Sequence, residues 1–356
     1  MRRASALAAT AIALALVPTG TAHADAPGPT DYRSEITSIS SADGQTLPEV
    51  FEVTVEGHDS FLLLTIDRGS TAAVAGYEGE PYLRFDADGS VYENRLSFST
   101  VYNRDRYGSV ERPDYIDHSA APEWILVDDD GSFAWHDHRI HYMDPRPPIG
   151  AEPGDIIIDT SVPITVDGVT FDITVASTLL TSPSPLPTLV ISVMAAAGVA
   201  VVILRTASTR RTAGATAATA MLALVTGVGW YVSLPGDADP SITWILFPAT
   251  GIVAALVALR AALGQRSFTA SAASLVALVQ LALWAAGRLG IYNAALLPTA
   301  LPQWIDRLVS AAVIGALAPL FYRIALDLVR PEHAERPSAP RSSLHGGAFT
   351  AAIAVA

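Results

Sequence analysis

The chain has 356 residues, of which 50% are apolar and only 16% are charged. Its 22 basic residues, all arginines, face 35 acidic residues, which gives a net charge of −13. Residues 25–185 hold 29 acidic residues and 9 arginines, whereas the rest of the chain has a surplus of arginine. A single soluble globule does not divide its charge in this way. The acidic part argues against nucleic-acid binding, which needs a basic surface. The absence of Cys excludes disulfides, thiolate metal sites and cysteine nucleophiles.

The N-terminus has the pattern of an export signal. Residues 1–3 are basic at positions 2 and 3, Ala4–Val17 is an apolar run, and Ala22-His23-Ala24 places small residues at the −3 and −1 positions. The pattern predicts a signal peptide over residues 1–24, cleaved after Ala24. The alternative is an uncleaved anchor, but a run of 14 residues is short for a membrane span, which needs about 20.

Residues 25–181 are predicted to form an acidic all-β domain, an immunoglobulin-like sandwich or a related one. Short apolar runs alternate with turn signals and show no helical period. Asp-Gly pairs, of which Asp167-Gly168 is the clearest, favour tight turns between strands. Two small subdomains divided near Arg112-Pro113 are an alternative, and Tyr102–His118 is expected to be a long loop. The predicted strands are Val50–Glu56, Phe61–Asp67, Ala72–Gly76, Tyr82–Asp86, Trp124–Val127, Ser132–Tyr142, Ile156–Asp159, Ile164–Asp167 and Thr170–Leu179.

The C-terminal half is predicted to be an all-α transmembrane bundle over residues 188–330, joined to the β-domain by a proline-rich linker at residues 182–187. An exported β-domain would leave eight arginines in the inner loops and tail and two in the outer loops, in agreement with the positive-inside rule. We therefore expect a multi-pass protein of a bacterial plasma membrane, with its N-terminal domain outside and a disordered tail, residues 331–356, inside. The five predicted helices are Leu186–Leu204, Ala213–Leu234, Ile242–Leu263, Ala270–Ala286 and Leu308–Val329.

The predicted helices contain few ionisable residues, whereas transporters and ion pathways usually place such residues within the membrane. Gln280 is an isolated amide, and Arg323 and Asp327 are four residues apart on one helix, where their side chains can pair. Arg288, Asp306 and Arg307 are assigned to an outer loop. The bundle is therefore expected to contact the lipid bilayer as an anchor or assembly platform rather than to conduct a solute.

A histidine cluster is the strongest candidate site, and His136, His138, His141 and Met143 are its candidate metal ligands. Residues i and i+2 of a strand share a face, so the imidazoles of His136 and His138 point the same way. One β-bulge would bring His141 and Met143 onto that face. Imidazole suits copper or zinc, and a thioether favours copper. The neighbouring residues 128–130, all Asp, are candidates to orient the imidazoles or to form a solvated turn.

The same residues also fit a structural network without metal. Trp135 and Ile140 are candidate core residues, Asp137 and Arg139 a cross-strand ion pair, and the histidines could hydrogen-bond to carboxylates. A pH-responsive cluster is a third interpretation. No catalytic motif is present in the sequence, so we expect a non-catalytic protein. The competing function is an envelope structural or interaction module that recognises a protein partner through its acidic face. The oligomeric state is left open.

Two resemblances bear on these predictions. The signal, the segments Tyr77–Arg84 and Trp135–His141, and the Ala- and Arg-rich helices resemble uncharacterised exported multi-pass membrane proteins of actinobacteria, for which no activity is assigned. Ser41-Ala-Asp-Gly44 is similar to a segment of CopC-type periplasmic copper-resistance proteins, in which a His follows the Gly. Here Gln45 follows and the predicted mature chain starts with Asp25, so the copper ligands of that family are not supported at their usual places.

Overall fold

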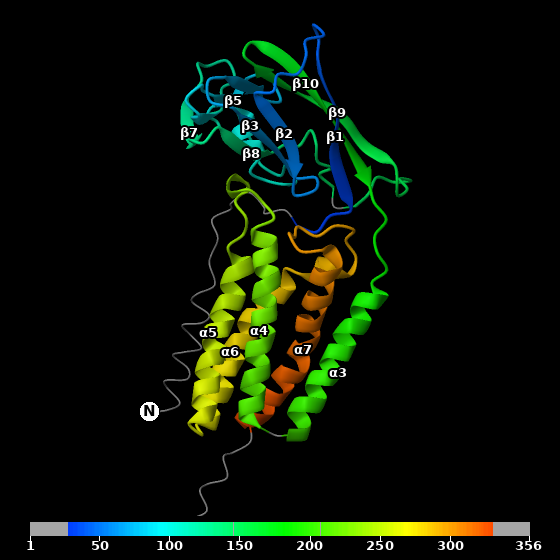
Figure 1. Cartoon of the computed structure of the whole chain (residues 1–356), viewed down its shortest axis with the longest axis vertical. Helices are drawn as coiled ribbons and strands as arrows, with labels where there is room; N and C mark the ends of the chain where they lie inside the picture. The colour runs from blue at the N-terminus through cyan, green and yellow to red at the C-terminus, as the bar shows by residue number, and fades with distance from the viewer. Residues whose placement is uncertain (1–27, 145, 207, 330–356) are drawn as a thin grey trace, which may run out of the picture.

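A computed structural model describes residues 28–144, 146–206 and 208–329 and shows a β-domain stacked on one end of a helical bundle (Figure 1). The predicted signal peptide, its cleavage site and the tail at residues 331–356 lie outside these described residues. The strands are β1 Tyr32–Ser41, β2 Phe51–Glu56, β3 Phe61–Ile66, β4 Ala72–Ala75, β5 Pro81–Phe85, β6 Val91–Asn94, β7 Trp124–Asp128, β8 Ser132–His136, β9 Ile156–Val166 and β10 Val169–Leu179. The helices are α2 Phe98–Tyr102, α3 Leu186–Thr206, α4 Thr209–Tyr231, α5 Thr243–Leu263, α6 Ser267–Ala286 and α7 Gln303–Val329, with short 3-10 turns η1 Gly236–Ala238 and η2 Leu289–Tyr292.

The β-domain consists of two antiparallel sheets, which confirms the predicted sandwich class. One sheet has seven strands in the order β1-β10-β9-β4-β5-β6-β7, and the other has the order β2-β3-β8. One apolar core lies between them, and it includes Leu64 and Trp135 of the smaller sheet and Phe85, Ile164 and Phe171 of the larger. Alternation of buried and exposed residues along β10 is what a strand with one face on this core requires.

The β9–β10 hairpin forms at the predicted Asp167-Gly168 turn, where both residues have positive φ (47° and 84°). Ile156–Asp159 and Ile164–Asp167, predicted as two strands, belong to the single strand β9. Its interior Pro163 is tolerated because the pairing of β4 with β9 stops at Ile164, so no strand requires the missing N–H of the proline. Strands β1 and β6 were not predicted, because the ten residues of β1 are mostly polar and β6 has only four residues.

The long loop predicted at Tyr102–His118 is preceded by a short helix, α2, whose N-terminus is capped by the Ser97 side chain. The strand predicted over Ser132–Tyr142 is too long: β8 ends at His136, and a turn follows, closed by a hydrogen bond from the Ile140 N–H to the Asp137 carbonyl (3.1 Å). This turn, rather than the expected bulge, sets the directions of the next histidines.

Five helices in the described part of the chain are long and apolar enough to cross a membrane, as predicted. Helix α3 packs on α7 at very close range, because Gly315 of α7 has no side chain to separate it from the Ser192 carbonyl of α3. The predicted pair of Arg323 with Asp327 forms at 2.7 Å. Helix α3 begins at Leu186, the first residue predicted for this helix, so the last two residues of the predicted linker belong to the helix.

Of the residues assigned to the outer loop, Arg288 does lie in the connection between α6 and α7, whereas Asp306 and Arg307 belong to α7. Helix α7 starts at Gln303, directly after a proline that favours helix initiation, and so includes Asp306 and Arg307. Arg288 is 1% exposed and pairs with the fully buried Asp306 at 3.4 Å, and its guanidinium lies 3.8 Å from the centre of the Trp230 ring. The end of the bundle nearest the β-domain therefore contains a buried, aromatic-flanked ion pair.

The β-domain docks directly on the bundle. Phe61 and Ala134 of the smaller sheet pack with Leu234 and Ala238 of the α4–α5 connection. On the other side, the chain entering β1 pairs with the α6–α7 loop, residues 287–302, through the bridge between Thr30 and Leu296. The two parts are thus in direct contact in addition to being joined by the linker (Figure 1).

A buried histidine cluster as candidate functional site

The three predicted histidines lie close together inside the β-domain. His136 is the last residue of β8, and His138 and His141 follow in and just after the turn at residues 137–140. All three are buried, with 6%, 8% and 3% of their surface exposed. The ring centre of His136 lies 4.8 Å from that of His138 and 5.1 Å from that of His141, whereas the last two are 6.5 Å apart.

Each imidazole uses one nitrogen to bond to the protein. His138 donates from Nε2 to the carbonyl of Tyr102 (3.1 Å), and His141 donates from Nδ1 to the carboxylate of Asp59 (3.2 Å). His136 bonds to the backbone of Ser60. These bonds select the tautomer and the orientation of each ring, which is the role that outer ligands have around metal-bound histidines.

The second nitrogen of each ring is buried and has no hydrogen-bond partner: Nε2 of His136, Nδ1 of His138 and Nε2 of His141. A buried polar atom without a partner costs about 1–3 kcal/mol, so three in one cluster call for an explanation, such as a bound ion or ordered water. The nitrogens left free by the fixed tautomers are lone-pair donors, the form in which imidazole binds a metal.

The fit of the cluster to a metal ion is close but incomplete. Two imidazoles that share a tetrahedral ion at the usual ~2.0–2.1 Å metal–nitrogen distance have ring centres roughly 5 Å apart. The two distances from His136 match this spacing, and the His138–His141 distance exceeds it. Among the described ranges of the chain, no group of three or more His, Asp or Glu side chains could hold a metal ion as it stands. The rings would have to move to coordinate one ion.

Burial keeps the imidazoles neutral. It lowers the pKa of His136 well below the ordinary value, and the neighbouring His138 and His141 lower this pKa further. Burial also lowers the pKa of His138 and of His141, although the bond to Asp59 opposes this change for His141. Neutral imidazoles are the species that a metal ion needs.

An ion pair lies beneath the cluster. Asp59 is fully buried and accepts two bonds from Arg106, at 2.9 and 3.0 Å, besides the bond from His141. It also accepts bonds from the hydroxyls of Thr30 (3.0 Å) and Ser60 (3.1 Å). Burial alone would raise the pKa of Asp59, but Arg106 and His141 outweigh it and hold this pKa well below the ordinary value. Asp59 is therefore an anion whose oxygens are fully engaged.

Met143, the fourth predicted ligand, is linked to the cluster through Tyr102. The Tyr102 hydroxyl donates to the Met143 sulfur (3.6 Å), and the Tyr102 ring lies 4.3 Å from the ring of His138. Met143 also lines a surface pocket with Tyr107 and Asp144. The structure thus brings the three histidines together and places the thioether at the edge of the cluster.

Residues 128–130, the candidates to orient the imidazoles, do not do so. Asp128 is the last residue of β7 and Asp130 lies in the turn before β8, at the opposite end of that strand from His136. They face Asp237 of the α4–α5 connection, whose pKa is raised to about 6 by burial and by the charge of Asp128. The orienting groups are Asp59 and the backbone of Tyr102 and Ser60.

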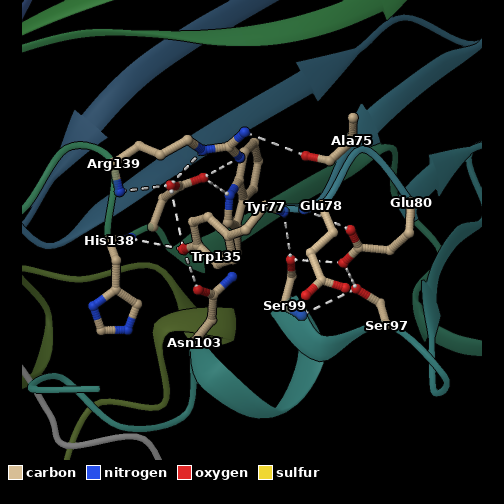
Figure 2. Close-up of polar contacts among 11 residues, drawn as sticks. Ala75, Tyr77, Glu78, Glu80, Ser97, Ser99, Asn103, Trp135, His138 and Arg139 are labelled. Atoms are coloured by element: carbon tan, nitrogen blue, oxygen red, sulfur yellow. Dashed lines mark hydrogen bonds and ion pairs between the residues drawn. The ribbon is translucent and has the colours of Figure 1, made fainter. Parts of the chain in front are cut away.

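A second network holds the turn at residues 137–140 (Figure 2). Asp137 accepts bonds from Trp135 (2.9 Å) and Arg139 (2.7 Å), and the hydroxyl of Tyr77 accepts a bond from the His138 N–H (2.8 Å). The Asn103 side chain accepts from that hydroxyl at 2.5 Å. Asp137 and Arg139 are paired, as predicted, but within one turn rather than across strands. The core positions predicted for Trp135 and Ile140 are confirmed, since both are buried in the main core.

Sequence reasoning missed Asp59, Arg106 and Thr30: Thr30 and Arg106 lie 29 and 47 residues from Asp59, and Asp59 lies 82 residues from His141. One local signal existed: Gly57, a residue type that adopts positive φ readily, stands in the turn between β2 and β3 just before Asp59, and its φ is 64°. Comparison with known proteins gives no further guidance, because no protein-family model, curated protein or solved structure matches the chain.

Proposed function

We propose that this membrane-anchored protein is a non-catalytic, extracytoplasmic metal-binding protein whose site consists of His136, His138 and His141. In each of these three neighbouring rings one nitrogen is hydrogen-bonded to the protein, and the other is buried and has no hydrogen-bond partner; this arrangement is the main support for the proposal. An ion coordinated by the three free nitrogens would satisfy all of them at once.

The chemistry of the donors favours zinc or copper. Three neutral imidazoles suit Zn²⁺ or Cu²⁺, and a thioether would shift the preference toward Cu⁺. Because Met143 lies at the edge of the cluster and bonds to Tyr102, its sulfur would have to move to become a ligand.

The placement outside the cytoplasm is part of the proposal. It is supported by the export-signal pattern of residues 1–24 and by the distribution of arginine around five apolar helices. The assignment as non-catalytic is supported by the lack of a recognisable nucleophile or acid–base motif in the sequence.

The test uses the full chain in lipid nanodiscs, freed of metal by a chelator and titrated separately with Zn²⁺ and Cu²⁺ in a calorimeter. We expect one ion per chain with a Kd below about 1 μM, abolished by His136→Phe. His118→Ala is the matched control, because His118 has a side chain 58% exposed and pairs with Glu78 away from the cluster. Equal binding by the wild type and His136→Phe would contradict the proposal.

A second candidate function is an envelope structural or interaction module without metal, in which the histidines form a hydrogen-bond network. It is favoured by the bond that each imidazole already makes and by the lack of a closed ligand set. In that case neither ion binds stoichiometrically, and the search turns to protein partners of the acidic domain.

A further inference from the structure

Asp59 connects the histidine cluster to the helical bundle. Its Oδ2 accepts the Nδ1–H of His141 (3.2 Å) and the hydroxyl of Thr30 (3.0 Å). Thr30, itself 7% exposed, exchanges two backbone bonds with Leu296 of the α6–α7 loop, at 3.0 and 2.9 Å. Two residues, Asp59 and Thr30, therefore link a candidate metal ligand to a loop between two membrane helices.

The chain on either side of this connection also bonds to the α6–α7 loop. The Asp31 carboxylate accepts the backbone N–H of Ala295 (2.7 Å), and the imidazole of His58 donates to the carbonyl of Leu297 (2.9 Å). His58 holds a left-handed conformation (φ 70°), which costs a residue other than glycine some free energy and is maintained by its surroundings. Residues 30, 31 and 58 thus contact three consecutive loop residues.

The α6–α7 loop is in turn fixed to the helices. Arg307 in the first turn of α7 donates to the carbonyls of Ile291 (2.5 Å) and Ala294 (2.6 Å). At the start of the loop, Arg288 pairs with Asp306 of the same helix turn and donates to the Thr226 carbonyl of α4 (2.9 Å). A shift of this loop would therefore strain its bonds to the ends of α4 and α7.

We propose that metal binding at the histidine cluster strengthens the docking of the β-domain on the α6–α7 loop, with Asp59 and Thr30 as the connection. This inference rests on the proposed metal site. Coordination of His141 through Nε2 makes its Nδ1–H a stronger donor and fixes the ring, so its bond to Asp59 tightens. A better-fixed Asp59 holds the Thr30 hydroxyl and, through it, the backbone bridge to Leu296.

Because coupling between two sites is reciprocal, any gain in docking on metal binding must equal the gain in metal affinity on docking. Loss of the Thr30 hydroxyl should therefore weaken metal binding, although Thr30 contacts no ligand nitrogen. If the Thr30 hydroxyl only stabilised the backbone bridge between Thr30 and Leu296, its loss would leave the metal affinity unchanged.

The experiment measures hydrogen exchange of the Ala295 and Leu296 backbone amides in the full chain in nanodiscs, with chelator and with saturating Zn²⁺. These two amides donate to Asp31 and Thr30, so their exchange reports undocking directly. We expect Zn²⁺ to slow their exchange about fivefold or more, the lower range of typical coupling. In Thr30→Val the effect of Zn²⁺ should vanish, and Zn²⁺ affinity should fall by a similar factor.

Thr37→Val is the matched control, because the Thr37 hydroxyl is exposed on β1, the strand that follows Thr30, and bonds only to the Thr174 carbonyl (3.3 Å) among the bonds observed. It should keep the wild-type response. Stoichiometric Zn²⁺ binding with unchanged exchange at Ala295 and Leu296 would overturn the coupling and leave the metal site standing. Absence of Zn²⁺ binding in the wild type would instead remove the proposed function itself, and with it this inference.

Discussion

Removal of the Asp59 carboxylate should cost more stability than any other single polar change in the β-domain. Asp59→Asn keeps the shape of the side chain but replaces one acceptor oxygen by an N–H₂ donor, which would face the donors of Arg106, Thr30 and His141. It also leaves Arg106, 9% exposed, as a buried charge without its counter-ion.

Breaking a buried ion pair by removing one partner costs about 3–5 kcal/mol, a large share of the ~5–15 kcal/mol that holds a typical domain. The assay is chemical unfolding of the full chain in nanodiscs, followed by tryptophan fluorescence in the presence of chelator. Asp86→Asn is the matched control, since Asp86 pairs with Arg84 at 3.0 Å but both side chains are more than one-third exposed. Its loss should cost about 0–1 kcal/mol.

A cost below about 1 kcal/mol for Asp59→Asn, equal to that of the exposed pair, would refute this reasoning. It would mean that water reaches Asp59 and Arg106, and that the network beneath the histidines is not a dry, fully satisfied one. A cost in the expected range with chelator present would show that the network is stable without metal.

Three further changes give separate tests. In metal-free protein, His136→Phe should change the free energy of unfolding by only about 1 kcal/mol, because it removes an unpartnered nitrogen together with one bond; a loss above about 3 kcal/mol would identify a structural histidine. Gly315→Ala should destabilise the bundle by about 1–3 kcal/mol, since a Cβ there would lie 2.0 Å from the Ser192 oxygen. The control Gly198→Ala should be neutral, because a Cβ at that position would have no atom within 4 Å. Equal melting temperatures of the two variants would contradict the close packing of α3 on α7. Burial raises the pKa of Glu93 to about 7, so between about pH 4.5 and 7 the folded state holds a proton that the unfolded state releases, and the contribution of this group to stability is lost as the pH rises through this range. Glu93→Gln should therefore flatten the fall in stability over this range. An unchanged pH profile would exclude a neutral buried Glu93.

Much of the architecture could be predicted because it depends on local patterns. The five membrane helices follow from the length of their apolar runs alone. The β9–β10 hairpin follows from β-branched runs around Asp167-Gly168. Strand β6 could not be predicted because only Val91 and Asn94 of its four residues are buried. It is a strand because it pairs with β5 and β7, and these pairings depend on tertiary structure.

The candidate site was predicted in its members but not in its geometry. The period of a strand places His136 and His138 on one face, yet the chain leaves β8 after His136 because Asp137 turns inward to bond with Trp135 and Arg139. These bonds depend on tertiary packing, which no local period records. The role of Asp59 depends on contacts across 82 residues to His141, and a single sequence carries no signal at that range.

The ion pair in the bundle shows the opposite error. Arg288 and Asp306 were read as loop residues because charge marks the ends of apolar runs, but Asp306 belongs to α7. Arg288, 18 residues before it in the α6–α7 loop, is buried and pairs with it. Arg288 stacks over Trp230 and Trp284, so its charge is held against aromatic faces as well as the carboxylate. Hydropathy alone cannot separate a charge that ends a helix from one that its neighbours bury.

Coordination of one ion by His136, His138 and His141 can be tested directly by X-ray absorption at the zinc edge. The sample is the full chain in nanodiscs, loaded with one equivalent of Zn²⁺. Coordination by the three histidines predicts a first shell containing three imidazole nitrogens at ~2.0–2.1 Å, and predicts that His136→Phe lacks this shell. A first shell made only of oxygen, or a shell unchanged by that substitution, would contradict it.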